Sequence, residues 1–222
     1  MIKKSFKATV SSYFPQTLGH IFSIEGIDRY IAGSLQASLF IILLNYMPLS
    51  HAKAIEIFTA FLSLSYISPL LGGWIADRFL GSQKTLLVGS VITALGFLML
   101  NRFVEHWFMV GLSFTVIGTG LVKPNLAVLA GKNYTKKDVR KDLNYLVLYG
   151  FINLGNFLAI LTSPLIGELI KWEYAFILPT VLSFCNVFLV WNVQKRFGYY
   201  GSLPSSPHIL SPHRQQACVL QQ

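Results

Sequence analysis

The sequence predicts an all-α integral membrane protein, a bundle of six membrane-spanning helices. Two observations carry this prediction. The composition is 53% hydrophobic and only 12% charged, with a mean hydropathy of +0.54, and long apolar segments recur along the 222 residues. So few charged side chains cannot cover the surface of a water-soluble globule.

Each apolar segment is close to the length, about 17 to 25 residues, with which a helix crosses roughly 30 Å of hydrocarbon. The third segment is the shortest. The six predicted spans are residues 21–47, 55–76, 85–100, 107–130, 143–166 and 174–193.

The basic residues predict the orientation of these spans, because Lys and Arg gather in cytoplasmic loops. With residues 1–20 in the cytoplasm, thirteen of the eighteen basic residues fall on the inner side and three on the outer side. The net charge of +9 is therefore explained by the orientation of the spans in the membrane, and nucleic acid is not an expected partner. The inner residues are Lys3, Lys4, Lys7, Arg78, Lys84, Lys132, Lys136, Lys137, Arg140, Lys141, Lys195, Arg196 and Arg214, and the outer ones are Lys53, Arg102 and Lys171.

Three ionisable residues lie within the first span. Glu25 and Arg29 are four residues apart and Asp28 is three residues beyond Glu25, so all three can share one helix face. Ionisable side chains at bilayer depth are costly and usually face a cavity or each other. A charge cluster at the cytoplasmic start of the helix, without further function, is the alternative interpretation.

A charged, glycine-rich run, residues 72–81, separates the second span from the third and is followed by Lys84. It predicts a short cytoplasmic turn between two membrane helices. Its glycines would permit tight packing of the second span, and Asp77 and Arg78 would bind helix termini across the turn. A purely structural turn is the alternative to a role in gating.

The fourth span contains Lys123, about eight residues or ~12 Å from its cytoplasmic end, which is farther than a lysine side chain comfortably reaches. Pro124 follows it and frees a backbone carbonyl one turn earlier, near Gly120. We expect Lys123 to pair with Glu25 or Asp28, since both sides of the pair lie in the inner half of the bilayer. A kinked helix with a structural lysine is the alternative.

The chain changes character after the sixth span. Residues 198–222 are rich in Pro, Ser, His and Gln, carry no apolar period, and are expected to be an unrelated tail that is disordered or translated out of frame. The two cysteines, Cys185 and Cys218, indicate neither a disulfide framework nor a metal site.

Four motifs together resemble the proton-dependent oligopeptide transporter (POT) family of the major facilitator superfamily. The resemblance covers about residues 14–193 and implies the N-terminal six-helix bundle of that fold, a 3+3 inverted repeat, with the second six-helix half missing. The motifs are Glu25-x-x-Asp28-Arg29, the 72–81 run with Lys84, Gly118-x-Gly120-x-x-Lys123-Pro124-Asn125, and Tyr149, Asn153, Leu154 and Gly155 with Pro164 and Gly167 beyond.

The resemblance implies roles for individual residues. Glu25, Asp28 and Arg29 would be a proton-coupling cluster with Lys123 as salt-bridge partner, and protonation of an acid would weaken that pair and let the helices rock. The proton gradient would drive transport without a cofactor. Substrate contacts are implied for Tyr66, Asn153, Tyr30, Gln36 and Asn125, and a cytoplasmic gate motif for Gly73, Asp77, Arg78, Gly81 and Lys84.

This chain departs from the family pattern at two positions. Asp28 replaces the usual Glu, which keeps the charge on a shorter arm. Gln36 stands where the family has an arginine thought to hold the peptide carboxylate, and a neutral amide lacks the bidentate, charge-assisted geometry of an arginine. We therefore do not infer ordinary di- and tripeptide specificity from the resemblance.

The leading hypothesis is a proton-coupled symporter of small peptides or amino acids that works by alternating access, present as an incomplete N-terminal half that is either active or inactive. We expect it in the plasma membrane, a prokaryotic inner membrane, with substrate, protons, lipid and the missing half as partners. The alternative is a non-transporting membrane component that associates with a partner bundle. An enzyme is not expected, because no metal-ligand spacing and no nucleophile and base pair is visible.

Overall fold

The computed structural model describes residues 16–102, 104–132 and 140–197, so the predictions for residues 1–15 and for the tail, 198–222, lie outside the described residues. Six of the described helices are long and apolar enough to cross a membrane, which confirms the six predicted spans. The elements are α2 (Gln16–Asn45), α3 (His51–Ile75), η1 (Ala76–Leu80), α4 (Ser82–Leu100), α5 (Glu105–Lys132), α6 (Arg140–Leu169), η2 (Trp172–Tyr174) and α7 (Ile177–Phe197).

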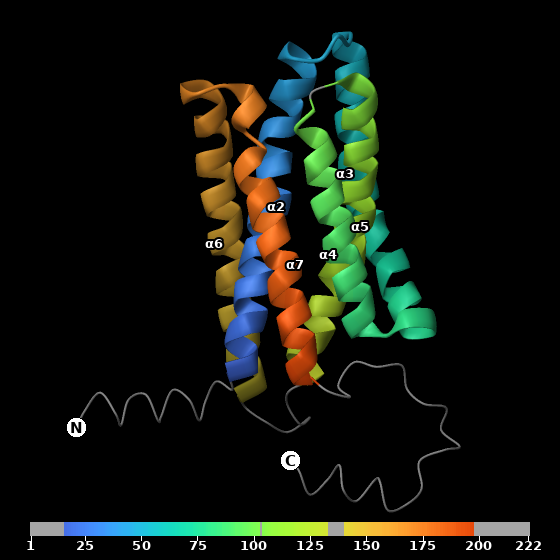
Figure 1. The fold of residues 1–222 in the computed structure, drawn as a ribbon, viewed down its shortest axis with the longest axis vertical. Coiled ribbons are helices and arrows are strands. Elements are labelled where there is room, and N and C mark those ends of the chain that lie inside the picture. Colours follow the sequence, from blue (N-terminus) through green and yellow to red (C-terminus); the bar gives the residue numbers. More distant parts are fainter. Residues whose placement is uncertain (1–15, 103, 133–139, 198–222) are drawn as a thin grey trace, which may run out of the picture.

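The long helices stand side by side along one axis (Figure 1). α2 packs on α6 and α7, and α5 packs on α4 and α3. α4 and α7 join these two groups, whereas α2 and α5 touch only lightly. The bundle therefore consists of two groups of three helices with a sparsely packed seam between α2 and α5.

Successive helices run in opposite directions, so the connections alternate between the two ends of the bundle (Figure 1). The start of α2, η1, the end of α5 and the end of α7 lie at one end. This is the end to which the distribution of basic residues assigns the cytoplasm.

The turn between α3 and α4 is shorter than the sequence predicted. The helix continues through Gly72 and Gly73 and ends in one π-helical turn, η1, whose exit is Gly81 with φ 77°. That left-handed conformation favours glycine, and the Gly81 carbonyl then accepts hydrogen bonds from the backbone N–H and the hydroxyl of Thr85. Only Gly81 turns the chain.

Gly72 instead allows α3 to approach α5, as expected for a glycine in a packed membrane helix. A Cβ atom on Gly72 would overlap the carbonyl of Gly120. Pro124 lies four residues after Gly120 and has no N–H with which to bond that carbonyl. The carbonyl freed by the proline therefore faces the backbone of the neighbouring helix.

The outer half of the bundle holds an aromatic core, and the two groups of helices meet there. The ring centroids of Phe97 on α4 and Phe176 lie 6.1 Å apart in an edge-to-face arrangement. Close by, Nδ2 of Asn101 donates to Oγ1 of Thr180 at 2.6 Å. Large apolar side chains such as Leu70 and Leu169, both 74% exposed, face outward, which is typical of a surface that meets lipid.

Candidate functional site

The charge cluster predicted on the first span is formed in the structure. Nη2 of Arg29 donates to Oδ2 of Asp28 at 2.7 Å, and Nε of Arg29 lies 3.0 Å from Oε1 of Glu25. The second contact is an ion pair without hydrogen-bond alignment, because Nε has no hydrogen-bond partner. Glu25 is 5% exposed and Asp28 1%, so both carboxyl groups are buried against a single guanidinium.

Lys123 lies at a similar depth on α5. Glu25 is six residues, or ~9 Å, past Gly19 at the inner end of its span, and Lys123 is eight residues, or ~12 Å, before Gly131 at the inner end of its own. Glu25, Asp28 and Arg29 all act electrostatically on Lys123. Four ionisable side chains from two helices are thus gathered across the seam between α2 and α5.

The direct ion pair that the sequence predicted between Lys123 and an acid of α2 is not formed. Among the described residues, Lys123 has no ion pair within 4.0 Å. Arg29 forms ion pairs with both acids instead, because it lies one residue from Asp28 and one helical turn from Glu25. The coupling role implied for Lys123 stays a prediction.

Three of the predicted substrate contacts are exposed side chains on three different helices. Tyr66 on α3 is 80% exposed, and Asn153 on α6 and Gln36 on α2 are also exposed. Gln36 shares a face of α2 with Glu25 and Arg29, since it lies eleven and seven residues beyond them. Their substrate role stays a prediction.

The other two predicted substrate residues are buried and make hydrogen bonds within the bundle. Asn125 is 2% exposed, and its Nδ2 donates to the carbonyl of Leu121 at 2.7 Å. Tyr30 is 7% exposed, and its hydroxyl lies 2.7 Å from Oγ1 of Thr162 on α6. Tyr30 is also five residues from Glu25, about 140° around the helix, so the structure does not bring it to the charged face.

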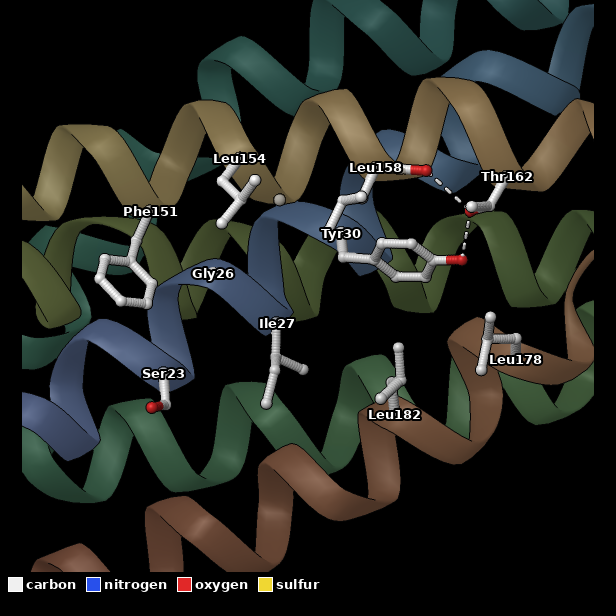
Figure 2. Close-up of a pocket in the computed structure, with 11 residues that line it drawn as sticks. Ser23, Gly26, Ile27, Tyr30, Phe151, Leu154, Leu158, Thr162, Leu178 and Leu182 are labelled. Carbon is white, nitrogen blue, oxygen red and sulfur yellow. Dashed lines mark hydrogen bonds between the residues drawn. The ribbon is translucent and has the colours of Figure 1, made fainter.

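Tyr30 lies at the floor of a lateral cavity of about 480 Å³ between α2, α6 and α7 (Figure 2). Its lining is almost entirely apolar and includes Ile27, Leu158 and Leu182. No charged side chain lines it, so it offers nothing to the charged ends of a peptide. The substrate site is therefore sought on the charged face of α2, away from this cavity.

The predicted gate residues, Gly73, Asp77, Arg78, Gly81 and Lys84, lie at and beside the turn between α3 and α4. Asp77, Arg78 and Lys84 are exposed. The contacts with helix termini that the sequence predicted for Asp77 and Arg78 are not found in the part of the chain that the structure describes. These side chains are left available at the inner end of the bundle.

The sequence reasoning missed the close contact of α2 with α6. A Cβ atom on Gly155 would overlap the carbonyl of Gly26, and one on Gly33 would lie 3.0 Å from Cβ of Ala159. The signal was present, since Gly155, Ala159 and Ser163 form a stripe of small residues spaced by four, the pattern with which membrane helices approach closely.

Comparisons with known proteins agree on one family. The sequence profile of the POT family matches residues 83–207. The chain is 32% identical to dipeptide and tripeptide permease A of Serratia proteamaculans (strain 568) over 193 residues, which is 86% of this chain and 38% of the permease. It is 28% identical to the di-/tripeptide transporter of Lactococcus lactis subsp. lactis (strain IL1403) over 215 residues, 92% of this chain and 43% of that protein.

Solved structures show the same similarity. A crystal structure of a peptide transporter POT in complex with sulfate superposes with a TM-score of 0.79 at 27% identity, covering 93% of this chain and 43% of that one. The in meso crystal structure of the POT family transporter PepTSo gives a TM-score of 0.79 at 29% identity, with 90% and 40% covered. The chain spans about two fifths of the length of the relatives that it matches.

Proposed function

Because the chain belongs to the POT family, we propose that it forms the first six-helix bundle of a proton-coupled symporter of small peptides or amino acids. The matches cover the N-terminal part of the relatives. In this proposal a second six-helix bundle forms the other wall of the substrate cavity. Alternating access then comes from rocking of one bundle against the other around a site near the middle of the membrane.

The observation that carries this proposal is the buried cluster of Glu25, Asp28 and Arg29 with Lys123 beside it. Two carboxylates and two cations balance in charge. A proton bound by Glu25 or Asp28 removes one negative charge, so the acids of α2 attract Lys123 on α5 less strongly and the cluster gains a net positive charge. Proton entry thereby changes what holds α2 and α5 together.

Substrate would bind on the surface that faces the second bundle, and the exposed side chains of Gln36, Tyr66 and Asn153 would line that surface. Each of these side chains can hydrogen-bond a peptide group, and none carries a formal charge. The second bundle supplies the opposite wall. An uncharged contact at Gln36 favours substrates that do not depend on a cation there for binding their carboxylate.

Asp77, Arg78 and Lys84 would meet the second bundle at the inner end, where they act as a gate. The chain is a multi-pass membrane protein by its six apolar helices and its family. We place it in the plasma membrane, a prokaryotic inner membrane, with the N-terminus in the cytoplasm, on the basis of the basic residues at that end.

The test is uptake of a labelled dipeptide into proteoliposomes that contain this chain co-expressed with the second bundle of the Serratia proteamaculans permease. The expected result is uptake that requires an acidic exterior and disappears when the gradient is collapsed. Each bundle reconstituted alone is the control. Absence of acid-driven uptake in the assembled pair would overturn the transport proposal.

A further inference from the structure

We propose that Tyr30 is a positioning residue whose hydroxyl, bound to Thr162, makes α6 follow α2 when the charge cluster is rearranged. The inference rests on the proposed function, because transport would require a change at Glu25 to reach the exposed residues of α6. The hydrogen bond of Tyr30 would transmit that change. Tyr30 itself need not touch proton or substrate. Tyr30 directly follows Arg29 in the chain, and its hydrogen bond joins α2 to α6.

The direction of this hydrogen bond follows from the number of protons. The hydroxyl of Thr162 has one proton, which it donates to the carbonyl of Leu158 at 2.7 Å. The Tyr30 hydroxyl must therefore donate to Oγ1 of Thr162 across 2.7 Å (Figure 2). α2 is thus the donor and α6 the acceptor in a chain of two hydrogen bonds that runs into the α6 backbone.

A second link joins Ser38, about two turns beyond Tyr30 on α2, to Ser163, the α6 residue next to Thr162. Oγ of Ser38 and Oγ of Ser163 are 2.7 Å apart, and Ser163 donates to the carbonyl of Ser34 at 3.3 Å, so Ser38 donates to Ser163. Hydrogen bonds between membrane helices add to the van der Waals contact that small residues permit. The α2 and α6 backbones are therefore joined by hydrogen bonds at Thr162 and Ser163, in addition to the close contacts at Gly26 and Gly33.

No other helix packs on α6 as extensively as α2 does among the described residues. Within the described residues, α6 packs substantially only on α2 and on the short η2, and the lateral cavity separates it from α7 beside Tyr30. α2 in turn meets α5 only lightly, across the seam that holds the charges. A shift of α2 along that seam therefore carries α6 and Asn153 with it.

The experiment measures distances between spin labels in the full chain in lipid nanodiscs, in a background with Cys185→Ser and Cys218→Ser. One label pair, Leu161→Cys on α6 and Leu64→Cys on α3, reports α6, and both positions are more than half exposed. A second pair, Asn45→Cys on α2 with Leu64→Cys, reports α2. Both are recorded with and without Glu25→Gln, which removes one charge of the cluster permanently.

With native Tyr30, Glu25→Gln is expected to shift both distances. With Tyr30→Phe, which keeps the ring, the shift of the α2 distance is expected to remain and the shift of the α6 distance to become smaller, because the Ser38 bond and the glycine contacts still join the two helices. Thr162→Val should reproduce this reduction, and the two substitutions together should add nothing further. Ser23→Ala is the matched control, because that hydroxyl lines the same cavity but donates to Gly19 of its own helix.

A full α6 shift in both Tyr30→Phe and Thr162→Val would overturn the inference, and so would the absence of any shift with native Tyr30. An equal reduction in Ser23→Ala would overturn it as well. No substrate and no second bundle enter these measurements. Failure of proton-driven uptake would therefore count against the proposed transport alone and leave this result standing.

Discussion

Nε of Arg29 lies 3.0 Å from Oε1 of Glu25, one turn away on the same helix. The Arg29 side chain is 14% exposed and that of Glu25 7%, so the pair is largely desolvated. Removing one member of such a pair leaves the other charge buried without compensation.

Arg29→Met is therefore expected to destabilise the protein by about 3 kcal/mol or more, because two buried carboxylates lose their cation. The measurement is thermal unfolding in detergent, followed by tryptophan fluorescence. Arg102→Met, at an exposed position beyond α4, is the control and should melt like the native chain. Equal melting of the two variants would show that Arg29 does not stabilise the fold.

Lys123→Ala is expected to reduce proton-driven uptake to background while counterflow exchange continues, because the lysine serves coupling rather than substrate binding in the proposed mechanism. Both assays use the assembled pair of bundles. Lys53→Ala, an exposed lysine at the start of α3, should leave both unchanged. If Lys123→Ala lowers exchange as much as uptake, its role is structural.

Gly72→Ala is expected to destabilise the bundle by about 2 kcal/mol, because the new methyl group overlaps the Gly120 carbonyl and pushes α3 away from α5. Gly73→Ala is a close control, since its Cβ would come no nearer than 3.8 Å to Pro124. Unfolding in detergent compares them. Similar stabilities would mean that α3 and α5 separate without cost.

Gly81→Val is expected to cost about 1–2 kcal/mol, because the residue has φ 77° and a β-branched side chain is strained there. Gly81→Asn should cost less, since Asn tolerates the left-handed region. The ranking is read from the same unfolding assay. A reversed ranking would mean that the turn adopts another conformation in the membrane.

Gln36→Arg is expected to lower the KM for a dipeptide about tenfold, the effect of roughly 1.4 kcal/mol from one charge-assisted contact. A dipeptide amidated at its C-terminus is the control, because it has no carboxylate to attract the new cation. An equal change for both substrates would place Gln36 away from the carboxylate.

The six spans followed from the sequence because apolar length alone decides whether a helix can cross the membrane. The grouping of Glu25, Asp28 and Arg29 followed from their spacing on one helix. Which cation pairs with the two acids could not be predicted from the sequence, because the choice between Arg29 and Lys123 depends on the separation of α2 and α5. Local spacing brings Arg29 within reach of both acids whatever that separation is.

The role of the glycines was only half predicted. Tight packing at Gly72 followed from the residue type, but a turn and a helix contact look alike in a glycine-rich run, and only Gly81 proved to be the turn. The bond from Tyr30 to Thr162 joins residues 132 positions apart, and no local pattern records which helix a hydroxyl will meet.

That separation along the chain also orders events during synthesis. α2 reaches the membrane well before its partner α6, and at about 5–20 residues per second the ribosome needs on the order of ten seconds to make the intervening segment. During this interval α2 carries three ionisable side chains into the lipid without its final neighbour. The ion pairs of Arg29 are complete within one turn of α2 itself, so the nascent helix neutralises one of its two buried negative charges before the rest of the bundle exists.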